Sequence, residues 1–418
     1  MRYVEFSTVR QGRGKRQVDF YALFMHIICI WIVRDVEPLL NRMISQFPAV
    51  LVTGARQTGK TSLLRHLFPR ASYITLDLPA HAEAATTAPD SLLNKYPEPL
   101  IIDEIQYAPA LLKHLKVRID KNRTPGRFLL TGSHGFALME GVSESLAGRC
   151  GILELLTLSY GEAQSARCSL DELSYIFLGG YPELYVGGDW EVWFPSYVAT
   201  YLERDVRNIS AVIDLQDFNR FLRVCALRNA QVVNYTDMAR DTGIAPNTAR
   251  KWVGLLVASG VLCLLEPYFG NRVKRIIKSP KLFFLDTGLA SFLAGFRRSQ
   301  DIMDSSFACA FWEGYVFGQI KRFYANRGMR VPLYYWRTVN GQEVDIVIEE
   351  SLGSIIAVEA KWKEHPAPDD AAGLNALSST YEGKIKMKVI VARTEARYQL
   401  RDGSWVMRMK DLLEVLKT

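Results

Sequence analysis

The chain has 418 residues, of which 49% are hydrophobic and 23% are charged. These proportions exclude a mainly disordered protein, and the length predicts two to three domains. The net charge is +7, but residues 218–281 hold 11 basic and 3 acidic residues, so the rest of the chain is close to neutral. Such a local basic block predicts a polyanionic partner for that segment. The six cysteines form no C-x-x-C pair, which argues against zinc and redox motifs and favours a reduced, cytoplasmic setting.

The first 33 residues differ from the sequence that follows. Several basic residues precede a largely apolar run of 14 residues at 20–33. This run is too short to cross a bilayer comfortably, and no small-x-small cleavage site follows it. We therefore expect residues 1–33 to be an extension, either a mis-assigned start or a loosely attached segment, and we expect no stable membrane span. Attachment to a membrane surface is the alternative.

Strands and helices alternate over the next segment. Residues 34–47 have helical apolar spacing, and short apolar runs follow at 49–53, 73–76, 99–103 and 128–131. Helical stretches between these runs predict an α/β fold with a mostly parallel sheet and helices on both faces. From 151 to 208 the pattern becomes helical and aromatic. We expect a core over 34–165 and a helical lid or linker over 166–212.

A glycine-rich loop follows the first of these strands. It matches G-x-x-x-x-G-K-[ST] and lies between an apolar strand and an apolar helix, the context that a phosphate-binding loop requires. The backbone N–H groups of such a loop and the positive end of the following helix bind phosphate oxygens. We expect Lys60 to reach the β- and γ-phosphates of ATP and the Thr61 hydroxyl to ligate Mg²⁺. The expected nucleotide site comprises Gly54, Ala55, Arg56, Gln57, Thr58, Gly59, Lys60, Thr61 and Ser62.

Residues at later strand ends complete the expected site. Asp103 would hold Mg²⁺ through water, and Glu104 would orient and activate the attacking water. This adjacent pair favours a nucleotide hydrolase over a protein that only binds nucleotide. Ser133 or His134 is expected to sense the γ-phosphate. Arg149 is a candidate to stabilise the transferred phosphoryl group, as an arginine finger if a neighbouring subunit supplies it; an ordinary surface ion pair is the alternative.

Taken together, these motifs resemble those of the bacterial and archaeal AAA-type P-loop ATPases. The chain carries GxRQxGKT, the DE-x-Q run at Asp103, an L-TGS strand and SL-GR in order, then GGYPE at 179–183 and Y-x-x-R-D-V at 201–206. The resemblance continues through the C-terminal domain and covers nearly everything after residue 33. It implies an ASCE-type sheet, with a further strand between the Walker A and Walker B strands. We expect residues 73–76 to be that strand.

The basic segment 213–285 is expected to form three helices and then two strands. Helix candidates at 232–238 and 246–259 flank a short turn, and the second begins near Asn247, Thr248, Arg250 and Lys251. This is the helix-turn-helix arrangement, and a basic hairpin at 271–275 would make it a winged helix. We expect it to bind DNA or another nucleic acid. Packing on the ATPase core as a lid or adaptor is the alternative.

The last segment, 305–418, follows an expected linker at 286–304. Glu359 and Lys361 are two residues apart in one strand, so both side chains point to the same face. Asp345 lies on the preceding strand, and Glu313 lies in the helix before it.

This order resembles the PD-(D/E)xK, restriction-endonuclease-like fold. The resemblance implies that Asp345 and Glu359 hold Mg²⁺, that Glu313 completes the acid cluster, and that Lys361 positions water or steadies the pentavalent phosphate. Solvated strand-end charges, or a domain that binds without cleaving, are the alternatives.

Two main functions remain open from the sequence, and a membrane-associated ATPase that uses residues 1–33 is a third, weaker option. The first is a Mg²⁺-dependent ATPase that couples hydrolysis to a nucleic-acid-directed activity through the winged helix and the nuclease-like domain. The second is a signal-transduction-type ATPase switch with a non-catalytic C-terminal domain. They differ on whether DNA stimulates hydrolysis. If Arg149 acts in the site of a neighbouring subunit, the protein is also expected to form a homo-oligomer.

Overall fold

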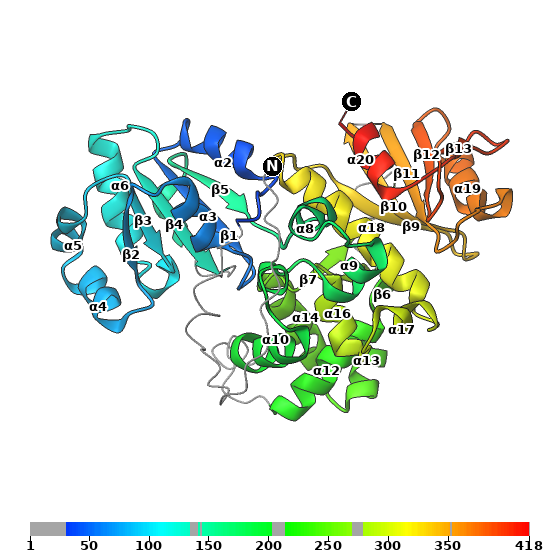
Figure 1. Ribbon diagram of the computed structural model, residues 1–418, viewed down its shortest axis with the longest axis horizontal. Coiled ribbons are helices and arrows are strands. Elements are labelled where there is room, and N and C mark those ends of the chain that lie inside the picture. Colours follow the sequence, from blue (N-terminus) through cyan, green and yellow to red (C-terminus); the bar gives the residue numbers. More distant parts are fainter. Residues whose placement is uncertain are drawn as a thin grey trace, which may run out of the picture. The chain divides into compact units, whose positions relative to one another are not determined.

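The computed structural model describes residues 31–133, 141–142, 144–202, 214–269, 279–351 and 353–417 (Figure 1). The chain from Ile32 onward belongs to one compact unit. Within the described residues there are three sheets, of five, three and six strands. The extension up to residue 30, His134, most of the Y-x-x-R-D-V run and the basic hairpin at 271–275 lie outside the described residues.

The first sheet is parallel, as predicted. Its order is β2-β3-β4-β1-β5. The strands are β1 (Ala49–Gly54), β2 (Ser72–Thr75), β3 (Leu100–Asp103), β4 (Phe128–Ser133) and β5 (Cys150–Glu154). Strands β1 and β3 are buried along their whole length, which explains why they read as continuous apolar runs in the sequence.

Helices cover this sheet. Leu112 and Leu115 of α6 share a core cluster with Leu51 and Ile102 of the strands. Helix α3 packs on β1, β3 and β4 and begins at the end of the glycine-rich loop. The helical elements of this part are α2 (Glu37–Ile44), α3 (Lys60–Leu67), α4 (Pro79–Thr87), α5 (Pro89–Lys95), η1 (Ile105–Tyr107) and α6 (Leu111–Lys121).

Two predictions about the sheet were wrong. The strand between the Walker A strand β1 and the Walker B strand β3 is β4, whereas the run at 73–76 forms β2 at the sheet edge. Strand order depends on crossovers, which spacing along the chain does not reveal. The region from residue 151 was expected to be helical, but residues 150–154 form β5, whose burial alternates because it lies at the other edge of the sheet.

The segment after β5 is helical, as predicted. Helix α8 begins with a capping box, in which Ser159 Oγ accepts from the Glu162 N–H and the Glu162 carboxylate accepts from the Ser159 N–H. The elements are α8 (Tyr160–Ala166), α9 (Glu172–Leu178), η2 (Pro182–Tyr185), α10 (Trp190–Tyr197) and η3 (Val198–Leu202).

Three helices and a small antiparallel sheet follow. Strand β8 lies between β6 and β7. Helix α13 starts three residues later than expected, because Asn234 caps it by accepting from the Thr236 and Asp237 N–H groups. The elements are α12 (Leu215–Leu227), β6 (Gln231–Val232), α13 (Tyr235–Thr242), α14 (Pro246–Ala258), β7 (Leu262–Leu265) and β8 (Lys281–Phe284). The two-residue strand β6 was not predicted.

Residues 286–304, expected to be a linker, instead form two packed helices, α16 (Thr287–Ala294) and α17 (Ser299–Met303). Buried Asp286 caps α16 by accepting from the Leu289 N–H, and Leu289 and Ala290 enter the core. Small and apolar residues at helical spacing make this segment part of the core.

The C-terminal part contains a mixed sheet of order β13-β14-β12-β11-β10-β9. Strands β10 and β11 are antiparallel, and β12 is parallel to β11. The elements are α18 (Ala308–Ala325), β9 (Leu333–Arg337), β10 (Glu343–Ser351), β11 (Ser354–Ala360), η4 (Pro368–Ala371), α19 (Ala372–Thr380), β12 (Ile385–Val391), β13 (Tyr398–Gln399), β14 (Trp405–Met407) and α20 (Met409–Val415). Among all described helices, none is long and apolar enough to cross a membrane.

Candidate functional site

The glycine-rich loop leaves the C-terminal end of β1 and enters α3. Gly54 has φ +147°, and a Cβ there would lie 2.3 Å from the Leu155 carbonyl oxygen, so only glycine fits. Gly59, with φ +91°, caps the start of α3. Lys60 Nζ donates to the carbonyl oxygens of Gly54 (3.1 Å) and Ala55 (2.8 Å), so the ammonium lies against the loop that would cradle phosphates.

The remaining loop residues have distinct surroundings. Thr58 is buried, and its hydroxyl donates to the Ala55 carbonyl oxygen at 3.0 Å. Gln57 is exposed in the left-handed backbone region with φ +63°, and Arg56 is half-buried beside it. Ser62 is exposed in the first turn of α3. The loop is therefore anchored from inside, while two of its polar side chains face solvent.

Asp103 is the centre of the acidic half of the site. Its Oδ1 accepts from the Thr61 and Thr131 hydroxyls, each at 2.5 Å, and its Oδ2 accepts from the Tyr73 hydroxyl at 3.0 Å. Burial, reinforced by the Asp103 carboxylate, raises the pKa of Tyr73 to about 12, so this phenol stays a donor. The Thr61 hydroxyl and the Asp103 carboxylate are oxygen ligands of the kind Mg²⁺ prefers, and they already meet at the start of α3. The residues present therefore fit a nucleotide-bound Mg²⁺.

Glu104 and Ser133 lie together at the ends of neighbouring strands. The Gln106 side-chain amide donates to Glu104 Oε2 and, at 3.2 Å, to Ser133 Oγ. Glu104 itself has φ +56°, an uncommon value for a residue with a side chain. Its N–H donates to Thr131 Oγ1 at 3.1 Å. The inserted strand β4 thus brings Ser133 beside the expected catalytic acid. Sequence reasoning missed the linking roles of Gln106 and Thr131, although both lie inside quoted motifs.

Arg149 does not lie near this chain's own phosphate loop. It directly precedes β5, at the N-terminal ends of the parallel strands, whereas the phosphate loop follows the C-terminal end of β1. Its guanidinium forms a two-pronged ion pair with Asp120, with Nε–Oδ1 at 2.6 Å and Nη2–Oδ2 at 3.0 Å. A role of Arg149 in the site of the same chain is therefore corrected to a surface ion pair. Its role in a neighbouring subunit stays a prediction.

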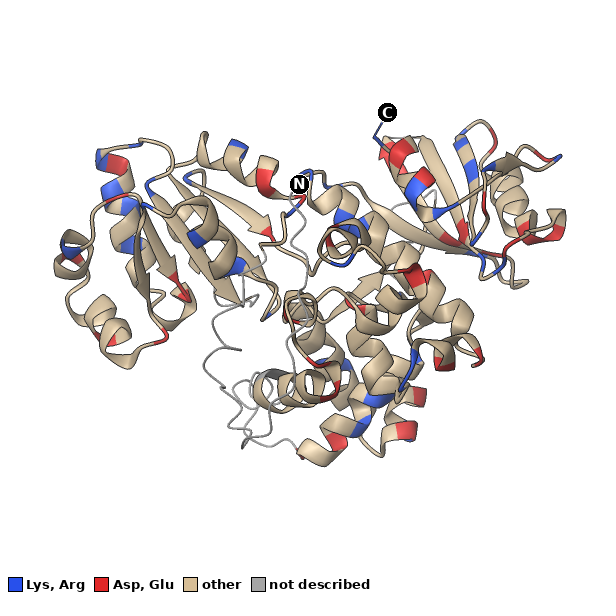
Figure 2. Ribbon diagram, in the orientation of Figure 1, with Lys and Arg blue, Asp and Glu red and all other residues tan. Residues whose placement is uncertain are grey.

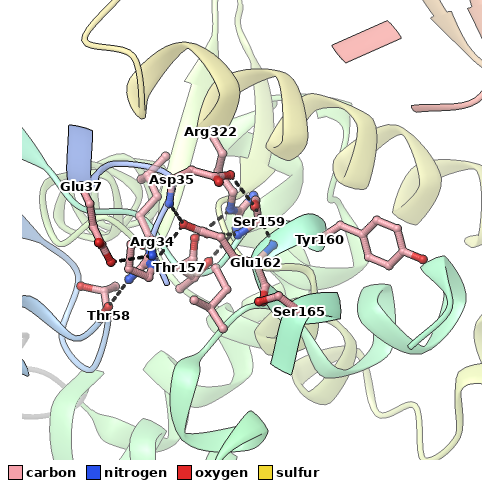
Figure 3. Close-up of polar contacts among 12 residues, drawn as sticks. Arg34, Asp35, Glu37, Thr58, Thr157, Ser159, Tyr160, Glu162, Ser165 and Arg322 are labelled. Carbon is pink, nitrogen blue, oxygen red and sulfur yellow. Dashed lines mark hydrogen bonds and ion pairs between the residues drawn. The ribbon is translucent and has the colours of Figure 1, made fainter. Parts of the chain in front are cut away.

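A buried arginine that the sequence did not single out holds the loop from behind (Figure 3). Arg34 is 4% exposed and donates to the carbonyl oxygens of Thr58 (3.0 Å) and Leu156 (2.8 Å). Its Nε donates to Glu162 Oε1 at 3.1 Å. The same carboxylate oxygen accepts from the Asp35 N–H at 2.6 Å. Arg34 therefore fixes the phosphate loop to the segment that follows β5.

A second buried arginine ties that segment to the C-terminal part. Arg322 of α18 donates to the backbone oxygen (3.1 Å) and hydroxyl (2.6 Å) of Thr157 and to the Leu285 carbonyl oxygen (Figure 3). Gln319 of the same helix accepts from the Tyr160 N–H at 3.0 Å. Helix α18 is thus bonded to residues next to those that hold the phosphate loop.

The basic segment is less positive on its described surface than its composition suggests. Three of its arginines pair with nearby aspartates, and Figure 2 shows acidic as well as basic residues on these helices. The pairs are Arg220–Asp217, Arg228–Asp241 and Arg240–Asp237. Near the start of α14, by contrast, Asn247, Arg250 and Lys251 are exposed. Gly260, just after α14, abuts the phosphate loop, because a Cβ there would lie 3.5 Å from Ala55 Cβ.

The acids of the C-terminal part come together as predicted. Asp345 and Glu359 lie on the adjacent strands β10 and β11. Asp345 Oδ2 accepts from the Ala360 N–H at 2.9 Å, and Lys361 Nζ lies 2.6 Å from Glu359 Oε1. Burial, and then the charge of Asp345, raise the pKa of Glu359 to about 8.

A lysine that sequence analysis did not single out lies among the acids Glu313, Glu343 and Asp345. Lys281 Nζ lies 2.7 Å from Glu313 Oε1 and 3.5 Å from Asp345 Oδ1, and it also contacts Glu343. Within the described ranges, no group of three or more His, Cys, Asp or Glu residues has an arrangement that could hold a metal ion. The predicted Mg²⁺ ligation by Asp345 and Glu359 therefore does not fit this arrangement.

Models of three protein families match separate parts of the chain. Residues 46–164 match an AAA domain, and residues 171–300 and 309–412 match two domains of unknown function, DUF8612 and DUF4143. Two uncharacterized proteins, Rv2008c of Mycobacterium tuberculosis and Mb2031c of Mycobacterium bovis, are each 34% identical over 394 residues. That is 93% of this chain and 86% of theirs.

Solved structures show more distant likeness. The Walker-type ATPase PABY2304 of Pyrococcus abyssi matches with a TM-score of 0.42 and 17% identity, covering 62% of this chain and 94% of that one. RuvB of Thermotoga maritima matches with a TM-score of 0.31 and 17% identity, covering 55% and 88%. Both scores are too low to assign an activity or an assembly to this chain.

Proposed function

Since the chain belongs to the family of the mycobacterial proteins Rv2008c and Mb2031c and carries an AAA-type ATPase domain, we propose that it is a Mg²⁺-dependent ATPase. The observation that carries this proposal is the contact between the Thr61 hydroxyl and Asp103, with Glu104 and Ser133 at the neighbouring strand ends. These are the parts that phosphoryl transfer to water requires. A protein that only binds nucleotide has no need of a second acid beside Asp103.

A few residues of the nucleotide site have defined tasks in the proposed hydrolysis. Lys60 leaves the carbonyl oxygens of Gly54 and Ala55 and binds the terminal phosphates. Thr61 and Asp103 would hold Mg²⁺ with the nucleotide, and the cation would neutralise charge that develops on the phosphates. Glu104 orients and deprotonates the attacking water, and Ser133 reports the terminal phosphate to Glu104 through Gln106.

The second part of the proposal is that residues 213–285 form a winged helix directed at nucleic acid. The order of helices and strands and the antiparallel sheet β6-β8-β7 support this. Exposed Arg250 and Lys251 at the start of α14 are placed to meet a phosphate backbone. If each contacts one phosphate, replacing both with alanine should lower the slope of log affinity against log salt by about 2. Arg220→Ala is the matched control, because Arg220 pairs with Asp217.

A switch without catalysis in the C-terminal domain is the second candidate, and two observations favour it. Gly260 contacts the phosphate loop at Ala55, as expected for a lid or adaptor, and Lys281 fills the acid cluster. In this alternative, binding and hydrolysis of nucleotide change the conformation of a partner-binding surface. Arg34, the segment after β5 and helix α18 connect the phosphate loop to that surface.

The deciding experiment is ATP turnover with and without DNA. Wild type should hydrolyse ATP, and Lys60→Ala should not, while the exposed control Lys113→Ala should match wild type. Stimulation by duplex or single-stranded DNA supports the nucleic-acid-directed reading, and indifference to both supports the switch. If calorimetry detects no binding of any purine nucleotide to wild type, the proposal fails.

A further inference from the structure

Lys281 is a buried cation inside an acidic cluster built by other elements. It is the first residue of β8, and its side chain is 3% exposed. Glu313 comes from α18, and Glu343 and Asp345 come from β10. The Tyr335 ring lies 5.6 Å from the ammonium and closes another side. The cluster therefore joins the small three-stranded sheet to the C-terminal sheet.

Charge explains why the ammonium stays there. Burial disfavours a lysine cation, but the carboxylates of Glu313, Asp345 and Glu343 outweigh this, and the pKa of Lys281 is raised above its ordinary value. Burial, and then Asp345, raise the pKa of Glu313. The cation and the acids depend on one another, because each would be costly to bury alone.

The same cluster has an unfilled acceptor. Glu359 is 6% exposed, and its Oε2 is buried without a hydrogen-bond partner among the described residues, although its Oε1 meets Lys361. Most buried carboxylate oxygens in proteins accept at least one hydrogen bond, so Glu359 Oε2 is an exception. Oxygens of Glu313, Asp345 and Glu359 are the type of ligand that a hard divalent cation takes. The donor chemistry suits a metal, but the Lys281 ammonium already contacts Glu313 and Asp345.

We propose that Lys281 is a resident cation that keeps divalent metal out of the C-terminal acid cluster. Strand β8, which begins at Lys281, is the central strand of its sheet and is paired with both β6 and β7, so the ammonium is held among the acids by the fold. The acid cluster is thus closed by a neighbouring part of the same chain. This inference does not depend on nucleotide hydrolysis.

The test is Mn²⁺ binding to the full chain, measured by titration calorimetry without nucleotide. Lys281→Met removes the charge and keeps an unbranched side chain, whereas Lys281→Arg keeps the charge. Lys386→Met is the control for loss of an ordinary ion pair, since Lys386 pairs with Glu350 at the surface of the C-terminal sheet, which also carries Asp345. Adding Asp345→Asn to wild type and to each variant identifies binding at the cluster.

We expect Lys281→Met to bind Mn²⁺ at least about tenfold more tightly than wild type, and the gain to disappear with Asp345→Asn. Lys281→Arg and Lys386→Met should match wild type. If uncompensated acids prevent Lys281→Met from folding, Lys281→Met/Glu343→Gln removes one of them and leaves Glu313, Asp345 and Glu359. Absence of the gain in whichever variant folds overturns the proposal. So does an Asp345-dependent Mn²⁺ site in wild type of equal affinity, whatever the variants do.

Discussion

Replacing Arg34 with methionine tests how the phosphate loop is held. Methionine keeps part of the apolar stem but loses all three donated hydrogen bonds, to Thr58, Leu156 and Glu162. Two separate losses follow. One concerns the free energy of unfolding, because the Glu162 carboxylate is left buried without its cation. The other concerns nucleotide affinity, because the loop loses its anchor.

The sizes of these losses follow from the burial of the pair. The Arg34 and Glu162 side chains are 5% and 2% exposed, and removing one partner of a buried pair costs about 3–5 kcal/mol of stability. The lower end applies here, since Glu162 still accepts from the Asp35 and Ser159 N–H groups. A hydrogen bond from a charged donor contributes about 1.5–3 kcal/mol, so full loss of the Thr58 anchor corresponds to about 10- to 150-fold weaker binding of nucleotide.

Arg322→Met is the matched control. Arg322 is equally buried, at 4% exposed, and also makes three hydrogen bonds, but they go to Thr157 and Leu285 and none reaches the phosphate loop. Urea unfolding should show a loss of stability in both variants. Calorimetry with ATP, at a temperature where circular dichroism shows both folded, should show weaker binding only in Arg34→Met. Equal affinities in the two variants would refute the idea that Arg34 positions the loop.

Three further outcomes are expected. Glu104→Gln should bind ATP as wild type does but hydrolyse it at least about 100-fold more slowly in a phosphate-release assay, because the water loses its base. Glu172, whose carboxylate accepts from the Tyr315 hydroxyl at 3.0 Å, has a pKa raised by burial. The folded state therefore holds the Glu172 proton more tightly than the unfolded chain does. As a result, the free energy of unfolding falls as pH rises above the ordinary pKa of a glutamate. Glu172→Gln should lack that fall when urea midpoints at about pH 4 and about pH 7 are compared. Arg149→Ala should leave ATP affinity unchanged and shift the urea midpoint little, because it loses only a solvent-exposed ion pair with Asp120. A large drop in turnover that mixing with Lys60→Ala chains restores would instead assign Arg149 to a neighbouring subunit's site.

The local parts of the nucleotide site could be predicted because they are contiguous in the chain. Eight neighbouring residues form the phosphate loop, and their spacing already determines which groups face an anion. The buried strands β1 and β3 read as apolar runs because both faces are covered, and Asp103 follows directly from the end of one of them. The three helices of the basic segment were equally visible, from helical spacing and from Pro246 at a helix start.

Only the tertiary structure decided which strand lies between β1 and β3, since crossovers set strand order and runs of similar length can occupy any position in the sheet. It also decided the two buried cations. Arg34 meets a carboxylate 128 residues away, and Lys281 meets acids 32 and 64 residues away. Nothing in the sequence around either residue distinguishes it from a charged residue at a solvated surface. Their roles arise because long-range packing removes the water around them. A buried charge without water is costly unless an oppositely charged group of the protein pairs with it.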